Sequence, residues 1–171
     1  MRRLLFAVCC AATSLAAQPS RAIIGLAGWP NKFPIEDVTV PFTLDAPLAK
    51  SYAAVKAAFA ELKVPIDMDD PAGGLVGVQL TKAQNTFAGY RMSRIFDCGE
   101  KSTMGPNADS YRLTMVFLAL LDPLDATHTK LRVGFVASAV PSSGSRTEAL
   151  QCGSTGVIEA KLVELVSARL K

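Results

Sequence analysis

Two neighbouring apolar stretches decide the fold of this chain: YRLTMVFLALL at residues 111–121 and KLRVGFVASAV at residues 130–140. Both runs are rich in β-branched, aromatic and leucine side chains, which is typical of strands. Residues 122–129, which include Pro123, separate the two runs and predict a hairpin-like turn. Together the two stretches predict an antiparallel strand pair within a sheet.

A strand and then a helix are predicted before this pair. The stretch VTVPFTL at residues 38–44 alternates as a half-buried strand does, and Pro41 favours an edge position or a bulge. The helix that follows should be capped by Asp45 and should end at Pro65. Its apolar stripe recurs every three or four positions and consists of Leu48, Tyr52, Val55, Phe59 and Leu62.

Further strands and a second helix complete the pattern. Residues 75–81 and 87–96 predict strands whose aligned side chains are Val76, Val78 and Leu80 in the first, and Tyr90, Met92, Arg94 and Phe96 in the second. Residues 141–150 are typical of a flexible loop. The last helix should start near Ser154 or Thr155. Its apolar face consists of Ile158, Leu162, Leu165 and Val166.

The order of these elements is strand, helix, four to five strands and helix. It predicts an α+β fold with two layers, in which the N-terminal and C-terminal helices cover one face of an antiparallel sheet. In element order, residues 38–171 resemble the helix-grip domains of the outer-membrane assembly lipoprotein BamC. The resemblance implies a helix-grip-like fold and a role in envelope assembly, and it carries no motif from which a functional residue could be assigned.

The N-terminus has the pattern of a secretory signal peptide. A basic start, MRR, precedes the apolar stretch LLFAVCCAATSLAA at residues 4–17, which is shorter than the run of about 18 residues that a transmembrane helix needs. We expect a signal peptide at residues 1–17, with cleavage after Ala17 or, alternatively, after Ala22. An organellar transit peptide is the other interpretation, since the first acidic residue is Glu36. Residues 18–37 then form a linker or tail, and residues 38–171 a single α+β domain.

Removal of the signal peptide changes both the charge and the cysteine content. The chain has 18 basic and 15 acidic residues, and loss of Arg2 and Arg3 leaves 16 basic residues. This near balance does not point to nucleic acid as a partner. Cleavage also removes Cys9 and Cys10. Cys98 and Cys152 remain, and an even number of cysteines in an exported protein predicts a disulfide.

The sequence shows no clear pattern for a metal site or a catalytic site. A structural zinc site needs about four ligands, whereas these two cysteines and His128 offer three, and a thiol nucleophile would depend on that one histidine. The spacing of Asp67, Asp69 and Asp70 does not fit the calcium loop of an EF-hand. We therefore predict no catalytic residue, no metal and no cofactor.

The stretch CGSTG at residues 152–156 has two interpretations. Glycines and hydroxyls before a helix can bind an anion with free backbone N–H groups, and the candidate residues are Gly153, Ser154, Thr155 and Gly156. Alternatively, Ser154 or Thr155 caps the helix and Glu159 favours its first turn.

The sheet raises a question about its second face. Alternation predicts that Leu113, Met115, Phe117, Leu131, Val133 and Phe135 face the helices. The opposite face then carries Val116, Leu118, Leu120 and Val136, near Arg91, Arg112 and Arg132. Either residues 122–129 or the N-terminal tail covers this apolar face, or it is a surface for self-association or for an anionic partner.

These patterns favour an exported, non-catalytic binding or envelope-assembly module that one disulfide stabilises. Its expected partner is an unknown protein or an anionic envelope component. The alternative is a small-molecule-binding protein or enzyme with a cavity between sheet and helices. A deep apolar pocket with convergent polar groups would favour the alternative, and a filled core would favour the module.

Overall fold

The strand pair predicted from residues 111–140 forms the centre of the molecule. In the computed structural model, which describes residues 21–99, 105–141 and 148–171, β9 (Tyr111–Pro123) pairs with β10 (Thr129–Pro141) along its whole length. The pairing is antiparallel and runs from Tyr111 opposite Pro141 to Pro123 opposite Thr129. The predicted hairpin is therefore confirmed.

A seven-stranded sheet is built around this pair in the order β4, β5, β9, β10, β11, β8, with β3 also paired to β10. The pairings between its strands are antiparallel. The added strands are β3 (Thr39–Leu44), β4 (Met68–Asp70), β5 (Leu75–Ala83), β8 (Phe96–Asp97) and β11 (Leu150–Ser154). β3 and β11 lie along the same edge of β10, β3 beside its first half and β11 beside its second.

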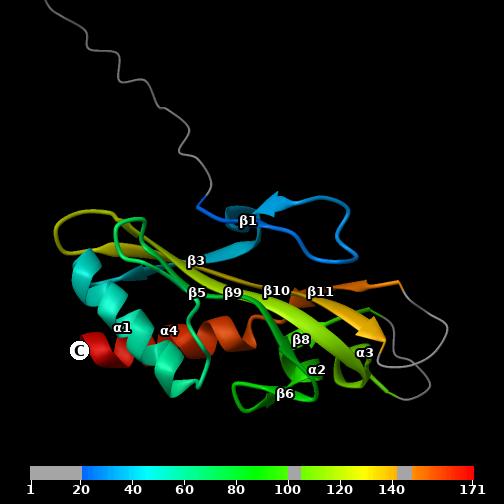
Figure 1. Ribbon diagram of the computed structural model, residues 1–171. Coiled ribbons are helices and arrows are strands. Elements are labelled where there is room, and N and C mark those ends of the chain that lie inside the picture. The colour runs from blue at the N-terminus through cyan, green and yellow to red at the C-terminus, as the bar shows by residue number, and fades with distance from the viewer. Residues whose placement is uncertain (1–20, 100–104, 142–147) are drawn as a thin grey trace, which may run out of the picture.

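Two long helices, α1 (Leu48–Glu61) and α4 (Val157–Leu170), pack against each other on one face of the sheet (Figure 1). Two short helices, α2 (Met92–Ile95) and α3 (Asn107–Ser110), lie nearer the opposite end. The predicted helical stripes face the core: Tyr52, Val55, Phe59, Leu62, Ile158, Leu162, Leu165 and Val166 are all buried. The α+β class and the helix-covered face are thus as predicted.

A third layer covers the second face of the sheet. We call residues 21–38 the N-terminal arm; it contains β1 (Ile23–Ile24), β2 (Phe33–Pro34) and the 3-10 helix η1 (Ile35–Val38). Figure 1 shows the arm, in blue, on the side of the sheet opposite α1 and α4. Ile24 and Ile35 are fully buried in a second apolar cluster. The segment predicted as a linker is therefore, from residue 21 onward, a packed part of the fold.

Three local predictions were wrong. A register shift between Val78 and Thr81 turns Leu80 outward at a φ of 58°, so that it is 50% exposed and leaves the line of Val76 and Val78. Residues 87–96 are not one strand, because they form the hairpin of β6 (Thr86–Phe87) and β7 (Tyr90–Arg91), then α2 and the start of β8. Both ends of the predicted loop at residues 141–150 belong to strands, Pro141 to β10 and Leu150 to β11, and its residues 142–147 lie outside the described residues. The last helix, α4, begins only at Val157.

The predicted signal peptide, residues 1–17, lies outside the described residues and stays a prediction. Among the described residues, none of the helices has both the length and the apolar character that crossing a bilayer requires.

Candidate ligand groove

The space between sheet and helices is filled by aromatic side chains. Phe117 and Phe135 lie on neighbouring strands with ring centroids 4.9 Å apart. Phe59 of α1 packs on Phe117 at 4.8 Å, and Phe96 packs on Phe135 at 4.3 Å. Phe87 stacks on Phe135 at 5.7 Å. Such offset and tilted contacts are the arrangements that aromatic pairs prefer. The rings therefore fill the space between sheet and helices, which is the space where a helix-grip fold could otherwise hold a ligand.

A hollow of about 480 Å³ lies outside this core, on the surface. We call it the groove; α1, its C-terminal extension, the β6–β7 turn and α4 surround it. Its lining consists of Glu61, Leu62, Lys63, Ala88, Gly89, Tyr90, Lys161 and Leu165. The volume is within the range of about 300–1,000 Å³ that is typical of small-ligand sites.

The end of α1 places two charged side chains at the groove. The backbone N–H of Lys63 donates to the carbonyl of Ala60, and that of Val64 donates to the carbonyl of Phe59, each at 3.0 Å. Lys63 has a φ of 55°, so this is a Schellman-type helix end with a left-handed residue. The chain reverses at once, and Glu61 and Lys63 remain at the open rim.

A tight hairpin forms the opposite wall. Phe87 pairs with Tyr90, and the two residues between them, Ala88 and Gly89, have φ values of 49° and 81°. Two successive positive φ angles are typical of a type I′ turn, which matches the twist of the flanking strands. Phe87 packs against the core, whereas Tyr90 lines the groove with the guanidinium of Arg94 5.6 Å from its ring centroid.

Positive charge exceeds negative charge around the groove. Glu61 forms an ion pair with Arg169, and Lys161 donates to Glu164 at 2.9 Å. The hydrogen bond to Glu164 is the main cause of the raised pKa of Lys161. Lys63 has no ion pair within the described part of the chain. Glu61 and Glu164, the two acidic groups near the groove, therefore have cationic partners. The ammonium of Lys63 at the rim is left to contact a ligand.

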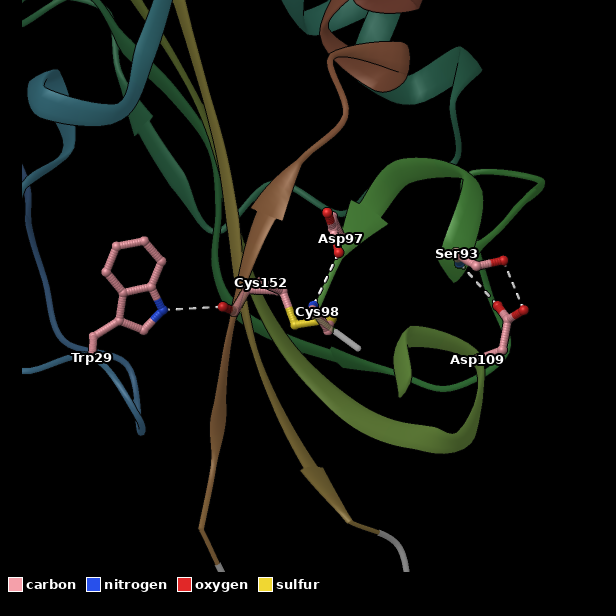
Figure 2. Close-up of a disulfide and its surroundings, with 8 residues drawn as sticks. Trp29, Ser93, Asp97, Cys98, Asp109 and Cys152 are labelled. Atoms are coloured by element: carbon pink, nitrogen blue, oxygen red, sulfur yellow. Dashed lines mark hydrogen bonds between the residues drawn. A yellow bond between two sulfur atoms is a disulfide. The ribbon is translucent and has the colours of Figure 1, made fainter. Parts of the chain in front are cut away.

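The predicted disulfide is confirmed and links Cys98 to Cys152 (Figure 2). Cys152 lies within β11 and Cys98 directly follows β8, one register position beyond the pairing of Asp97 with Gly153. Their Cα atoms are 4.2 Å apart. Both residues are buried, at 5% and 0% exposure, which fits a structural bond. The bond therefore ties the end of β8 to β11.

The hydroxyls of the CGSTG loop are used within the protein. Thr155 Oγ1 donates to the carbonyl of Arg94 at 2.8 Å, and Ser154 Oγ accepts from the N–H of Gly156 at 3.0 Å. Ser154 also hydrogen-bonds Glu159, a carboxyl that is only 3% exposed. These contacts favour the helix-start interpretation over an anion site at residues 153–156, although the N-cap is Gly156 and makes no side-chain cap bond.

The predicted partner surface does not exist as an apolar surface. Val116, Leu118 and Leu120 are fully buried and Val136 is 4% exposed, in one cluster with Ile24 and Ile35 of the arm. The alternative that the N-terminal tail covers this face is therefore confirmed. Of the three arginines named with it, Arg132 donates to Asp122 at 2.9 Å, whereas Arg91 and Arg112 are exposed.

The remaining polar candidates have structural partners. Asp69 accepts from Tyr52 at 2.7 Å and from Lys56 at 2.6 Å. Asp67 and Asp70 accept from the backbone N–H groups of residues 79 and 73. His128 contacts Asp125 in the turn between β9 and β10, and hydrogen bonds from residues 127 and 128 lower the pKa of Asp125. Among residues 21–99, 105–141 and 148–171, no cluster of His, Cys, Asp or Glu side chains is suited to hold a metal ion.

Comparison with known proteins finds no relative: no protein-family profile, curated protein or solved structure matches the chain. The resemblance to the BamC helix-grip domains stays a prediction. The structure itself defines the class, an antiparallel α+β domain with a filled core and one disulfide. Sequence reasoning missed the groove, because its lining comes from three segments that no motif connects.

Proposed function

We propose that this protein is an exported, non-catalytic binding module that holds an anionic partner in the groove. The observation that carries the proposal is that the hollow able to hold a ligand lies at the surface and not between sheet and helices. The volume between sheet and helices is occupied by packed phenylalanines, while the hollow of about 480 Å³ lies at the surface and is lined by Lys63 and Lys161. A recessed surface with surplus positive charge suits binding of an anionic group.

The disulfide supports the exported part of the proposal. Disulfides persist in oxidising compartments and are rare in the cytosol. A buried Cys98–Cys152 bond thus fits the signal-peptide pattern at residues 1–17, and it fits a periplasmic or secreted location. An oxidising organelle is the alternative location. Envelope assembly is the wider role that the BamC-like element order suggests.

Site-specific photo-crosslinking in the native host tests the binding site. A photoreactive phenylalanine derivative replaces Glu61, at the groove, or Ala53, an exposed position on the same helix. We expect a discrete adduct, seen as a mass shift of the purified protein, from position 61 and none from position 53. Equal labelling at both positions, or none at 61, would contradict the proposed binding site.

Cell fractionation with intact-mass measurement tests export separately. The native protein should be recovered outside the cytosol, without its signal peptide, and with Cys98 and Cys152 oxidised. Recovery in the cytosol with Met1 retained would overturn the exported location and leave the crosslinking result to stand by itself.

A further inference from the structure

We infer that the groove is selective for a small amphiphilic anion: a short alkyl or acyl chain that ends in one carboxylate or phosphate. This inference rests on the proposed function, since it names the ligand class of the same groove. The observation behind it is that the side chains on the floor of the groove are apolar, whereas those at its rim are cationic.

The floor of the groove is apolar. Leu62 and Leu165 are each only 8% exposed and present their remaining surface to the hollow, and Ala88 of the hairpin turn completes it. Because Leu62 and Leu165 also pack into the main core, they are held in place by the fold. A short hydrocarbon chain laid on this floor would bury apolar surface that is now open to water.

The rim is polar and cationic. Lys63, just after the end of α1, and Lys161 of α4 line the groove. Lys161 also pairs with Glu164, so Lys63 is the cation at the rim without an ion pair among the described residues. The Tyr90 hydroxyl adds a hydrogen-bond donor from the hairpin. Arg94, stacked over the Tyr90 ring, adds positive charge behind it. One anionic head group placed among these donors would be neutralised, whereas a cationic head group would meet repulsion.

The geometry also disfavours a larger or a neutral ligand. The packed core that contains Phe59 and Phe87 lies beneath the floor, so a long chain could not extend inward from the groove. A neutral chain would gain only the apolar contacts and would leave the ammonium of Lys63 without a partner. Selectivity should therefore depend on the charge of the head group more than on chain length.

Binding of four defined probes tests the ligand class. Octanoate, octyl phosphate, octanol and octyltrimethylammonium are titrated into the mature protein, below their micelle concentrations, and followed by backbone amide NMR shifts. We expect the two anions to shift the signals of residues 88–90, and their affinity to fall as salt rises because exposed charges are screened. Whether carboxylate or phosphate binds tighter distinguishes a fatty-acid-like ligand from a phosphate ester.

Matched variants locate the site. Lys63→Gln combined with Lys161→Gln should weaken anion binding at least tenfold, while Lys63→Arg with Lys161→Arg should retain it. Lys130→Gln, at an exposed position on β10 outside the groove lining, should bind as the unmodified protein does. Equal melting temperatures of the variants, measured by circular dichroism, would show that the differences in affinity do not result from unfolding.

Three outcomes would overturn the inference: equal binding of the cationic or neutral chain, undiminished anion binding by the double glutamine variant, or no binding of either anion. If neither anion binds while position 61 still gives its adduct in the host, the ligand class is wrong and the proposed function stands. If the anions bind in the groove but no adduct forms, the ligand class holds and the partner-binding function fails.

Discussion

Gly134 of β10 lies where the N-terminal arm packs against the sheet. A Cβ atom at this position would lie 2.8 Å from Ile35 Cδ1 and 3.1 Å from Ile35 Cγ1. Because Ile35 is fully buried, its side chain has little room to move away. The absence of a side chain at residue 134 therefore allows the arm to dock.

Gly134→Ala should lower the free energy of unfolding by about 1–3 kcal/mol, since it overpacks this contact. Ile35→Val alone should cost about 0.5–1.5 kcal/mol, but it removes the Cδ1 atom that the new methyl group meets. The double variant should therefore lose less than the sum of the two, which urea unfolding in a double-mutant cycle measures. Strictly additive losses would contradict the contact. Gly153→Ala, where a Cβ meets nothing within 4 Å, is the control.

Glu159 is a second residue whose surroundings have a measurable consequence. Its side chain lies in the first turn of α4, and one carboxyl oxygen, Oε2, has no hydrogen-bond partner among the described residues. Burial raises the pKa of Glu159 above its ordinary value, although the hydrogen bond from Ser154 partly opposes the shift. The folded state therefore holds the proton of this carboxyl more tightly than the unfolded state does.

The stability of the protein should consequently fall as pH rises from the unfolded pKa, about 4.3, through the raised pKa of folded Glu159. Glu159→Gln cannot ionise, so the variant should lack this component of the pH dependence and should be more stable than the unmodified protein at neutral pH. Thermal melting between pH 4 and pH 8 measures both effects. Glu148→Gln, at an exposed position, should leave the pH profile unchanged. An identical profile for Glu159→Gln would show that folding does not raise the pKa of this carboxyl.

At the scale of an element, the N-terminal arm is tied to the sheet at two places. The Arg21 guanidinium contacts Asp122 and the carbonyl of Leu121, the latter at 3.2 Å, and the Arg21 N–H donates to Glu36 at 3.1 Å. In the middle of the arm, the indole N–H of Trp29 donates to the carbonyl of Ala137 at 3.1 Å (Figure 2). The arm is thus bonded directly to the sheet that it covers.

A protein that begins at Ile23 should be less stable than one that begins at Gln18, by about 1–3 kcal/mol, because the partly buried bonds of Arg21 are lost. Arg21→Ala in the longer protein should reproduce most of this loss. Urea unfolding of the three proteins provides the measurement. Equal midpoints would show that Arg21 contributes nothing, and would leave Ala22 as acceptable a cleavage site as Ala17. The expected loss instead favours cleavage before Arg21.

At the scale of the whole molecule, the disulfide joins parts of the chain that are far apart. Cys98 and Cys152 are separated by 54 positions, and both central strands, β9 and β10, lie between them. A cross-link that encloses the centre of the sheet restricts the unfolded chain and so stabilises the folded one.

Replacing both cysteines by alanine should lower the free energy of unfolding by about 2–4 kcal/mol, the range typical of a disulfide. Reduction of the unmodified protein should produce a similar loss in urea unfolding. The same reductant should leave the double variant unchanged, which makes that variant its own control. Equal stability of oxidised and reduced protein would show that the bond does not limit the unfolded state.

Much of the architecture follows from the sequence because its signals are local. The stripe from Leu48 to Leu62 and the apolar runs at residues 111–121 and 130–140 each specify one element by periodicity or composition, and neighbouring elements then pack by short connections. The cysteine pairing also follows, since only Cys98 and Cys152 remain after the expected cleavage. The bulge at Leu80 did not follow, because it depends on the pairing of β5 with β9. The hairpin at residues 86–91 did not follow, because its turn places Ala88, which is not a residue typical of such turns, at a positive φ.

Only the tertiary structure decided what covers the second sheet face and where the protein can bind a ligand. The arm at residues 21–38 is rich in proline and glycine and has no clear period, so its docking depends on the distant apolar face formed by Val116, Leu118 and Leu120. The groove likewise combines residues 61–63, 88–90 and 161–165. Each of these segments looks ordinary alone, and its side chains become a site only because folding brings three separate surfaces together.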